Sequence, residues 1–442
     1  MEIYKFLGKE FKCPYCGKIH KIGVKKIESG NIDCLPDFIS KIIGKNKKIL
    51  ILADNITYRV AGEKIENILG KIWHVKSIIL NPEGEKRVTA QEKYLSKIEG
   101  KIEDEKIIIT VGTGTITDLG KIAADRFNIP VICFPTAASM NAYTSPVAAY
   151  IKNGMKLTIP VKSAEAIFMD FDVIKDAPVD LTKAGFADSL SKGYANADWK
   201  ISSMITGENF CFLPFEIMSK AEKKYVDKGK NILKKDGEII GYLMEGLNIG
   251  GISMSIAGKS SPVSGAEHLI SHFLDMYAHL NGKENFSWHG LQVGIGILFS
   301  SFVYEHLQNL NKKDMEMMFR ATKIDYESKI ENIEKNFLKG KPILKKEFEK
   351  KIKSLELLRE RFPSLWDGIK DEVRKFIHPY SEIRNFLKNA ECPLSFKEIG
   401  VSEELGYNSI LSARYIRDRL TILDIADELG IIEKIASEFM EE

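Results

Sequence analysis

The chain has 442 residues, and its 64 Lys and Arg against 61 Asp and Glu give a formal net charge of +3. This balance gives no basis for nucleic acid or an anionic membrane as a partner, and no apolar run approaches the ~20 residues of a membrane-spanning helix. The N-terminus, MEIYKFLGKEF, has no signal-peptide core, so we expect a cytoplasmic protein. The length exceeds the roughly 250–300 residues that one hydrophobic core supports, which predicts more than one domain.

Two cysteines and a histidine lie close together near the start of the chain, at Cys13, Cys16 and His20. Their spacing resembles half of a zinc knuckle, although a structural zinc ion takes four ligands. Cys34 is the only nearby residue that could complete a Cys3His set. A tight turn in an N-terminal extension, residues 1–40, explains the same segment without a metal, and both interpretations stay open.

From Lys47 onward the hydrophobic pattern alternates between strands and helices. Short apolar runs typical of strands occur at 48–53, 75–80, 106–111, 131–134, 157–161 and 166–170, with helical stretches at 58–69 and 90–98. This order is typical of a parallel sheet covered by helices on both faces. We therefore expect residues 41–178 to form a dinucleotide-binding α/β domain.

A glycine-rich turn follows the third of these strands. Gly112 and Gly114 open the segment GTGTITDLGK where a helix is predicted to begin, and such a turn lets backbone N–H groups approach a phosphate. The spacing is not that of the Rossmann G-x-G-x-x-G motif, so a plain tight turn is an alternative. The next strand runs into the loop 135–146, at the strand end where open α/β sheets bind ligands. An ordinary surface loop would have a similar composition.

Residues 179–442 are predicted to form a helical domain. Helical patterns occur at 182–203, 215–221, 237–257, 267–277 and 290–308. A Lys- and Glu-rich region, 311–375, follows with apolar residues at helical spacing, and we interpret it as solvated helices rather than as a binding tract.

Four of the eight histidines, His268, His272, His279 and His289, fall in one short part of this helical region. His268 and His272 are four residues apart, so on a helix both imidazoles leave the same face, and His289 follows. Asp188, among small and apolar residues, completes an Asp-His-His set with an open fourth position, which is typical of a catalytic divalent metal. Polar positions on ordinary helices are the alternative; the predicted dinucleotide domain favours a metal-assisted redox site.

Six motifs occur in one order along the chain: GTGTITDLGK, FPTAASMNAYTSP, GFADSLSKGYANADWKIS, SGAEHLISHFLDM, WHGLQVGIG and ARYIRDRLTILDIADELG. Together they resemble the sn-glycerol-1-phosphate dehydrogenase family, nearest its AraM-type bacterial branch. That family lies within the superfamily of glycerol dehydrogenase, iron-type alcohol dehydrogenases and dehydroquinate synthase. The resemblance extends from about Lys47 to Gly430 and is poor in the first ~40 residues and in 311–375. It implies a Rossmann-like N-terminal domain followed by an all-α C-terminal domain, as in dehydroquinate synthase.

The resemblance also implies an activity and a set of site residues. The activity is the NAD(P)- and metal-dependent reversible reduction of dihydroxyacetone phosphate to sn-glycerol 1-phosphate, a step of phospholipid biosynthesis. The metal, which is zinc, nickel or iron, would bind Asp188, His268 and His289, while His272 would touch the substrate and help to pass the proton. Asp188 and His272 are thus the expected catalytic residues. NAD or NADP would contact Asp54, the pyrophosphate turn Gly112, Gly114, Thr115, Ile116, Thr117 and Asp118, and the nicotinamide-side residues Thr136, Ala137, Ala138, Ser139 and Ser145.

Two departures from the family pattern affect the expected substrate contacts. Asn141 stands where the family usually has an Asp. The Asn side chain keeps a hydrogen bond but lacks the negative charge. Lys259 stands near the position of an expected Arg and would meet a phosphate as a point charge. The expected substrate-binding residues are Asn141, Asp188, His272 and Lys259.

Alternatives to this activity stay open. They are a related polyol or glycerol dehydrogenase, a sugar-phosphate cyclase of the same superfamily, and a non-catalytic variant that binds NAD and metal. Asp188 argues against the cyclase, in which Glu is usual at that ligand position. The superfamily also suggests a homodimer.

Overall fold

The structure is a computed structural model that describes residues 2–44, 47–336 and 341–442. By its internal contacts the chain forms two units. Unit 1 comprises Met1–Lys152, Lys156–Ser189 and Glu216–Lys259, and unit 2 comprises Asn153–Met155, Leu190–Phe215 and Ser260–Glu442. The division expected at residues 40 and 178 stays a prediction. In the structure, the first 40 residues and the helices of 216–259 group with the sheet.

Unit 1 contains a six-stranded sheet in which all pairs of neighbours are parallel, as the alternating pattern predicted. Its strands, in spatial order, are β3 (Lys26–Ser29), β10 (Ala166–Met169), β7 (Val131–Pro135), β6 (Ile107–Gly112), β4 (Lys48–Asp54) and β5 (His74–Leu80). The edge strand β3 lies in the residues expected to form an extension. Sequence pattern could not place it, because its four residues KIES are only partly buried and pair with β10, far along the chain.

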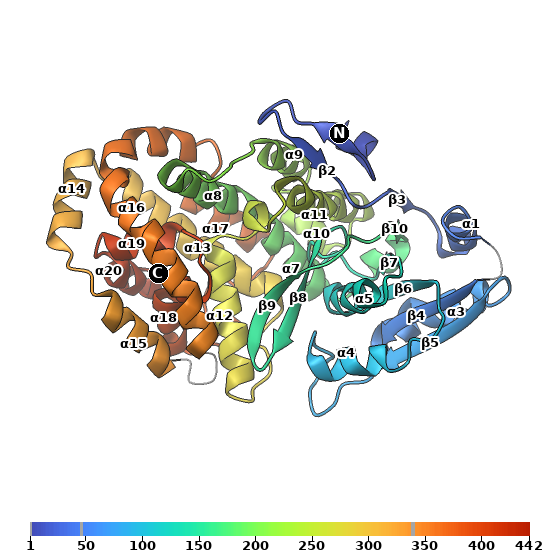
Figure 1. The fold of residues 1–442 in the computed structure, drawn as a ribbon. Coiled ribbons are helices and arrows are strands. Elements are labelled where there is room, and N and C mark those ends of the chain that lie inside the picture. The colour runs from blue at the N-terminus through green and yellow to red at the C-terminus, as the bar shows by residue number, and fades with distance from the viewer. Residues whose placement is uncertain (1, 45–46, 337–340) are drawn as a thin grey trace. The chain divides into compact units, whose positions relative to one another are not determined.

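Helices cover both faces of this sheet. Successive strand residues point to opposite sides, so each face carries apolar side chains that the helices bury. One face carries Ile49, Ile51 and Ala53 of β4 and their neighbours, packed against α1 (Leu35–Ser40), η3 (Tyr58–Gly62) and α3 (Glu63–Leu69). The other face meets α5 (Gly114–Phe127), which Figure 1 shows along the sheet. There Gly120 is required, because a Cβ would lie 2.2 Å from a methyl carbon of Thr110.

The strand order places a switch point at the carboxyl ends of β4 and β6. The chain passes from β4 outward to β5, then returns to the opposite side of β4 to form β6 and next β7. Open α/β sheets bind ligands at such a point. The predicted coenzyme residues Asp54 and Gly112 are the last residues of β4 and β6.

Unit 1 contains further strands and helices outside the six-stranded sheet. The strands β8 (Val147–Lys152) and β9 (Met155–Pro160) form a separate two-stranded sheet, of which sequence pattern had indicated only β9. The apolar helix α11 (Gly237–Ala257) has the length and hydropathy of a membrane span, yet 78% of its apolar window is buried within the protein. It is thus a core helix. The other elements are η1 (Glu2–Phe6), β1 (Glu10–Lys12), β2 (Ile19–Lys21), η2 (Ile32–Cys34), α2 (Asn55–Thr57), α4 (Glu92–Glu99), α6 (Phe171–Lys175), α7 (Val179–Leu190), α9 (Leu213–Glu222) and α10 (Gly229–Leu233).

Unit 2 is helical, as predicted for most of the C-terminal region. Its elements are α8 (Lys192–Thr206), η4 (Ser261–Val263), α12 (Ala266–Leu280), α13 (His289–Gln308), α14 (Lys312–Ala321), α15 (Tyr326–Asn336), α16 (Lys341–Val373), α17 (Tyr380–Asn389), η5 (Lys397–Ile399), α18 (Glu403–Ser412), η6 (Ala413–Ile416), α19 (Ile422–Glu428) and α20 (Ile432–Glu441). The antiparallel neighbours α12 and α13 pack closely and carry the predicted histidines.

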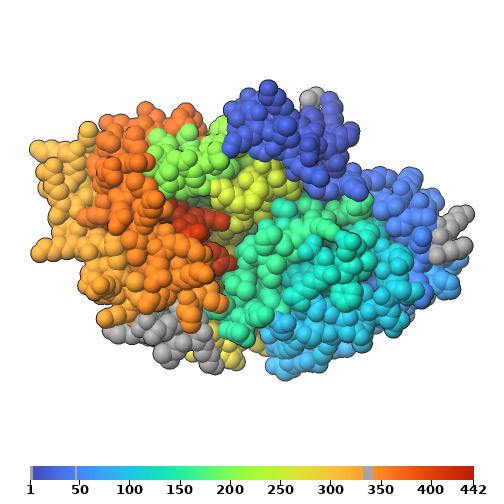
Figure 2. Space-filling model, viewed as in Figure 1, coloured from blue at the N-terminus to red at the C-terminus, as the bar shows by residue number. Residues whose placement is uncertain are grey.

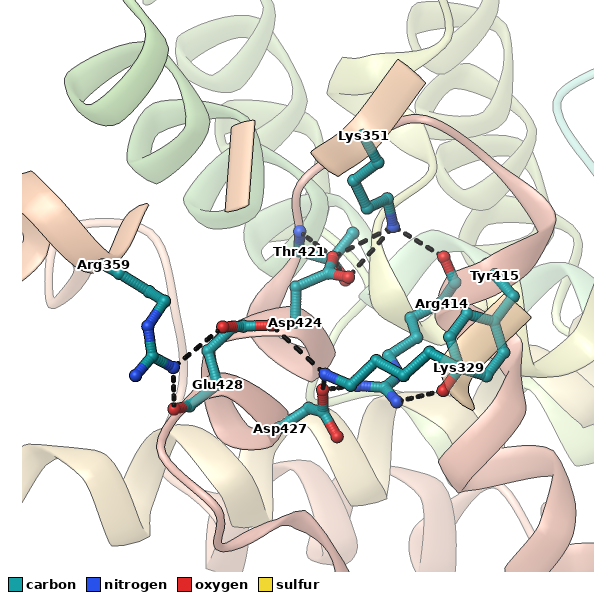
Figure 3. A network of polar contacts seen from close by, with 9 residues as sticks. All are labelled: Lys329, Lys351, Arg359, Arg414, Tyr415, Thr421, Asp424, Asp427 and Glu428. Carbon is teal, nitrogen blue, oxygen red and sulfur yellow. Dashed lines mark hydrogen bonds and ion pairs between the residues drawn. The ribbon is translucent and has the colours of Figure 1, made fainter. Parts of the chain in front are cut away.

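A buried network of charged side chains ties α16 to the C-terminal helices of unit 2 (Figure 3). The Lys351 ammonium is fully buried and donates to the Arg414 carbonyl at 2.6 Å and to the Asp424 carboxylate at 3.0 and 3.2 Å. The Arg414 guanidinium forms an ion pair with Asp427, and Arg359 bonds Glu428 at 3.1 Å. The network therefore fixes both ends of the segment 414–428. Lys351 is an exception to the solvated helices expected at 311–375, because its ammonium lies in the protein interior.

Candidate active site

The predicted coenzyme residues of unit 1 gather at the carboxyl end of the sheet. Asp54 ends β4 and caps α2, where its Oδ1 accepts hydrogen bonds from the N–H groups of Ile56 (2.9 Å) and Thr57 (2.7 Å). Gly112 ends the neighbouring strand β6, and α5 begins at Gly114. The N-terminal N–H groups of a 14-residue helix thus lie at the switch point, where a pyrophosphate would be stabilised.

The glycine turn packs directly beneath the predicted nicotinamide-side loop. A Cβ at Gly114 would lie 1.9 Å from the sulfur of Met140, so only glycine allows the loop to approach the start of α5. Within the loop, the Thr136 N–H donates to the Gly112 carbonyl at 3.2 Å, and Ala137, Ala138 and Ser139 are buried. Asn141, the departure from the family pattern, follows Met140 and is partly exposed. Thr115, Ile116 and Thr117 form the first turn of α5.

A buried lysine that sequence analysis missed holds the second half of this loop. The Lys121 ammonium donates to three carbonyl oxygens, those of Ala142 (2.9 Å), Ser145 (3.1 Å) and Val147 (2.7 Å). Burial lowers the pKa of Lys121, an effect that the negative charge of Asp118 opposes. Lys121 is a positioning residue for Ser145.

Asp118 plays a different part from the other residues of the turn. Its carboxylate accepts from the Ala149 N–H at 3.1 Å and faces Lys121 at 3.5 Å. Burial raises the pKa of Asp118 to about 6, although Lys121 opposes this rise. These contacts are within the protein, so a role of Asp118 in holding pyrophosphate stays a prediction.

Asp188 lies on α7 close to the same loop. Gly185, three residues earlier on the helix, packs so tightly that a Cβ there would lie 1.9 Å from the Ala138 carbonyl oxygen. Asp188 is 1% exposed. Unit 1 thus places a buried carboxylate one helical turn from the contact with the nicotinamide-side loop. Lys259, the last residue of unit 1, follows the C-cap of α11 at Gly258 and is partly exposed.

The three predicted histidines meet in unit 2, between α12 and α13. The ring centroids of His268 and His289 are 5.3 Å apart, and His272 lies 6.0 Å from His268 and 5.6 Å from His289. His268 and His289 each offer a ring nitrogen within 4.8 Å of the other. The four-residue spacing on α12 and the start of α13 at His289 produce this cluster, as the helical pattern indicated.

Hydrogen bonds fix which ring nitrogen of His268 can bind a metal. His268 Nδ1 lies 2.8 Å from Glu267 Oε1, and this oxygen also accepts from the Gly265 N–H at 2.7 Å. Because the carboxylate is an acceptor, the proton of the neutral ring belongs on Nδ1. Nε2 is then the nitrogen with a lone pair for a metal, in the arrangement usual for metal-binding histidines.

A longer chain of hydrogen bonds fixes His289 in the same way. The Gln292 amide donates to Asp275 Oδ1 at 3.2 Å, so its oxygen faces Ser271, and Ser271 Oγ donates to that oxygen at 3.1 Å. Ser271 Oγ lies 2.9 Å from His289 Nδ1 and must therefore accept its proton. The lone pair is again on Nε2. Both histidines thus fit a metal ligand by the hydrogen bonding of their Nδ1 atoms.

Two buried acids, Asp198 and Glu267, lie at the start of α12. Asp198 accepts from Tyr304 (2.6 Å) and from the N–H groups of Ala266 (2.8 Å) and Ile422 (3.0 Å). Burial, and next the negative charge of Glu267, raise the pKa of Asp198 to about 7. Asp198 thus anchors the first turn of the histidine helix. Sequence reasoning missed Asp198, Glu267, Ser271 and Gln292; only Glu267 offered a signal, as the residue directly before His268.

Comparisons with known proteins identify the family of the chain. The family model for iron-containing alcohol dehydrogenase matches residues 26–178. Glycerol-1-phosphate dehydrogenase (NAD(P)+) of Bacillus velezensis is 30% identical over 381 residues, which cover 86% of this chain and 85% of the relative. The enzyme of the same name from Pyrococcus furiosus is 33% identical over 268 residues, 60% of this chain and 74% of the relative.

Solved structures show the same fold at lower identity. An iron-containing alcohol dehydrogenase from Thermococcus thioreducens aligns with a TM-score of 0.62 at 14% identity, covering 96% of this chain and 99% of the other. Glycerol dehydrogenase from Schizosaccharomyces pombe aligns with a TM-score of 0.58 at 18% identity, covering 95% and 91%. From its similarity to curated relatives over most of their length, the chain belongs to the glycerol-1-phosphate dehydrogenase family, an oxidoreductase family with the iron-containing alcohol dehydrogenase fold.

Proposed function

We propose that the protein reduces dihydroxyacetone phosphate reversibly to sn-glycerol 1-phosphate in the cytoplasm, with NADH or NADPH and one divalent metal ion. The observation that carries the proposal is the pair of histidines in unit 2 whose Nδ1 atoms are bound by Glu267 and Ser271, so that both Nε2 atoms suit a metal. The names of the relatives support the substrate, since several act as glycerol-1-phosphate dehydrogenases. A homodimer remains part of the proposal.

The proposed metal ligands are Asp188, His268 and His289. One carboxylate and two imidazoles suit zinc first, and also nickel or iron. A metal held there would supply Lewis-acid polarisation of the substrate carbonyl, and the coenzyme would supply hydride. The burial of Asp188 and His268, which are 1% and 5% exposed, favours this chemistry, because excluding water strengthens charge interactions.

The chain's own residues would bind the substrate and move one proton. His272 lies on the same face of α12 as His268, and we propose that its ring hydrogen-bonds the substrate oxygen and passes a proton to or from it. Asn141 would contact the substrate through its amide. The loop from Thr136 to Ser145, held by Lys121, would position the nicotinamide.

A pair of arginines in unit 2 supports a phosphorylated substrate. Burial and the neighbouring Arg419 guanidinium lower the pKa of Arg417. Arg419 donates to Ser260 Oγ at 2.8 Å. Burial lowers the pKa of Arg419, and the negative charge of Glu267, the residue that holds His268, opposes this effect. Two neighbouring cations, one of them within electrostatic reach of Glu267, would favour an anionic substrate group. Lys259 would add a third cation, as expected from its place before Ser260.

The test is a panel of coenzyme oxidation assays. NADH and NADPH are each combined with dihydroxyacetone phosphate, dihydroxyacetone or glyceraldehyde phosphate, with added zinc, nickel or iron. We expect the highest kcat/KM with dihydroxyacetone phosphate. Preference for unphosphorylated dihydroxyacetone would instead identify a glycerol dehydrogenase. Turnover of a sugar phosphate without net NADH consumption would identify a cyclase, and coenzyme binding without any turnover a non-catalytic variant.

Replacing Ser271 with Ala is expected to weaken metal binding by about 10- to 100-fold while turnover recovers at saturating metal. The cause is loss of the acceptor that holds His289 Nδ1–H. Metal affinity is measured by competition with a chelator. Ser301→Ala is the matched control. Ser301 lies on α13, and within the described residues its side chain donates a hydrogen bond only to the Leu298 carbonyl. Equal affinities of the two variants would contradict the role of Ser271.

Replacing Asp54 with Ser is expected to shift the ratio of kcat/KM for NADPH over NADH upward by about tenfold or more, since roughly 1.4 kcal/mol of repulsion is removed. Serine still caps α2, so the fold is kept. Asp236→Ser is the control, because Asp236 caps α11 with the same two hydrogen bonds to backbone N–H groups. An unchanged coenzyme ratio in Asp54→Ser would show that Asp54 does not lie by the ribose.

A further inference from the structure

The N-terminal hairpin of unit 1 brings three metal-binding side chains together. β1 and β2 pair in antiparallel register with Lys12 opposite Ile19, and the loop between them carries Cys13 and Cys16. His20 lies on β2. Sulfur and nitrogen atoms of the three residues lie within 4.8 Å of one another, and Cys16 Sγ is 3.1 Å from His20 Nε2. Figure 2 shows this N-terminal segment, in dark blue, at the molecular surface.

The backbone of the loop has the form that presents two thiolates to one ion. The Cys13 N–H donates to the Lys18 carbonyl at 2.8 Å, and the Gly17 N–H donates to the Cys13 carbonyl at 3.0 Å. Gly17 has φ +70, which favours glycine and lets the chain turn back directly after Cys16. A C-x2-C pair on such a turn is the usual half of a structural zinc site.

The histidine is oriented as a ligand. Its Nε2 faces Cys16, while the ring also makes a hydrogen bond to the backbone of Ile256 on α11. A hydrogen bond between the ring and a backbone group is common for a metal-binding histidine. Cys13 is 1% exposed, so a metal here would be shielded from water on that side.

We propose that Cys13, Cys16 and His20 are three of the ligands of a structural zinc ion. This site is separate from the catalytic metal proposed above. Cys34, the candidate from sequence, is exposed on η2 and is not among the residues that the structure groups with the other three. The zinc would fix the hairpin, which packs on α11 through β2.

The proposal is tested by metal analysis and cobalt substitution of the full-length protein. Thiolate ligands give Co²⁺ an intense charge-transfer absorption that a carboxylate and imidazoles do not, so this signal reports the hairpin site and not the Asp-His-His site. We expect the absorption in the wild type and in His268→Ala. We expect its loss in Cys16→Ser.

Cys34→Ser is the matched control and is expected to keep the absorption unchanged. Because Cys16→Ser could fail to fold, X-ray absorption of zinc in the wild type is a second measurement, in which both sulfur and nitrogen neighbours are expected. Absence of thiolate–cobalt absorption in the wild type would overturn the proposal, as would a Cys13–Cys16 disulfide in metal-poor protein purified under reducing conditions.

Discussion

Replacing His268 with Ala, or Asp188 with Ala, is expected to reduce turnover of dihydroxyacetone phosphate by about 10³-fold or more, since several kcal/mol of transition-state stabilisation depend on the metal. In both variants bound catalytic metal and activity should be lost together. The measurements are the kcat of NADH oxidation and the metal content of the purified protein. The carboxylate comes from α7 in unit 1 and the imidazole from α12 in unit 2, so equal losses would show that both act on one ion.

His306→Ala is the matched control for this prediction. His306 lies in the last turn of α13, where it bonds the Phe302 carbonyl at 2.9 Å and Glu438 at 3.1 Å. It should keep full turnover and metal content. If His268→Ala bound as much metal as the wild type, the assignment of that ligand would be wrong.

Replacing Lys351 with Met is expected to destabilise unit 2 by about 3–5 kcal/mol. The ammonium is fully buried and contributes three hydrogen bonds, and its removal leaves the 1%-exposed Asp424 carboxylate without its cation. For a unit of this size the midpoint of thermal unfolding should fall by roughly 6–20 °C. Calorimetry at neutral pH measures this shift.

Lys350→Met is the control, because Lys350 lies one position earlier on α16 and its exposed ammonium pairs only with Glu347 among the ion pairs of the described residues. It should change stability by less than about 0.5 kcal/mol. The double variant Lys351→Met with Asp424→Asn should recover part of the loss, since it removes the unpaired charge. Equal midpoints of Lys351→Met and Lys350→Met would contradict a role of the buried pair in stability.

The parallel sheet could be predicted because its strands are local apolar runs. The runs at 48–53, 106–111 and 131–134 correspond to β4, β6 and β7, each buried on both faces. The edge strand β3 could not be predicted, since a short, partly polar strand depends on its partner β10.

The histidine cluster could be predicted from helical spacing, but its supporting residues could not. Ser271 and Gln292 are ordinary polar helix residues in the sequence, and their role depends on the packing of α12 against α13. Lys121 and Lys351 are similar cases. The sequence does not show that the Lys121 ammonium will bind three backbone carbonyls, or that the Lys351 ammonium will pair with a buried carboxylate.

The central claim is that one metal ion, held by Asp188 and two histidines, is required for the reduction. Its most direct test is titration of chelator-treated protein with zinc, nickel or iron while dihydroxyacetone phosphate-dependent NADH oxidation is followed, in the wild type and in Asp188→Asn. We predict that wild-type turnover is absent without metal and saturates when one ion per chain has bound outside the thiolate site, whereas Asp188→Asn does not respond. Full turnover of metal-depleted wild type, or an equal response of Asp188→Asn, would contradict it.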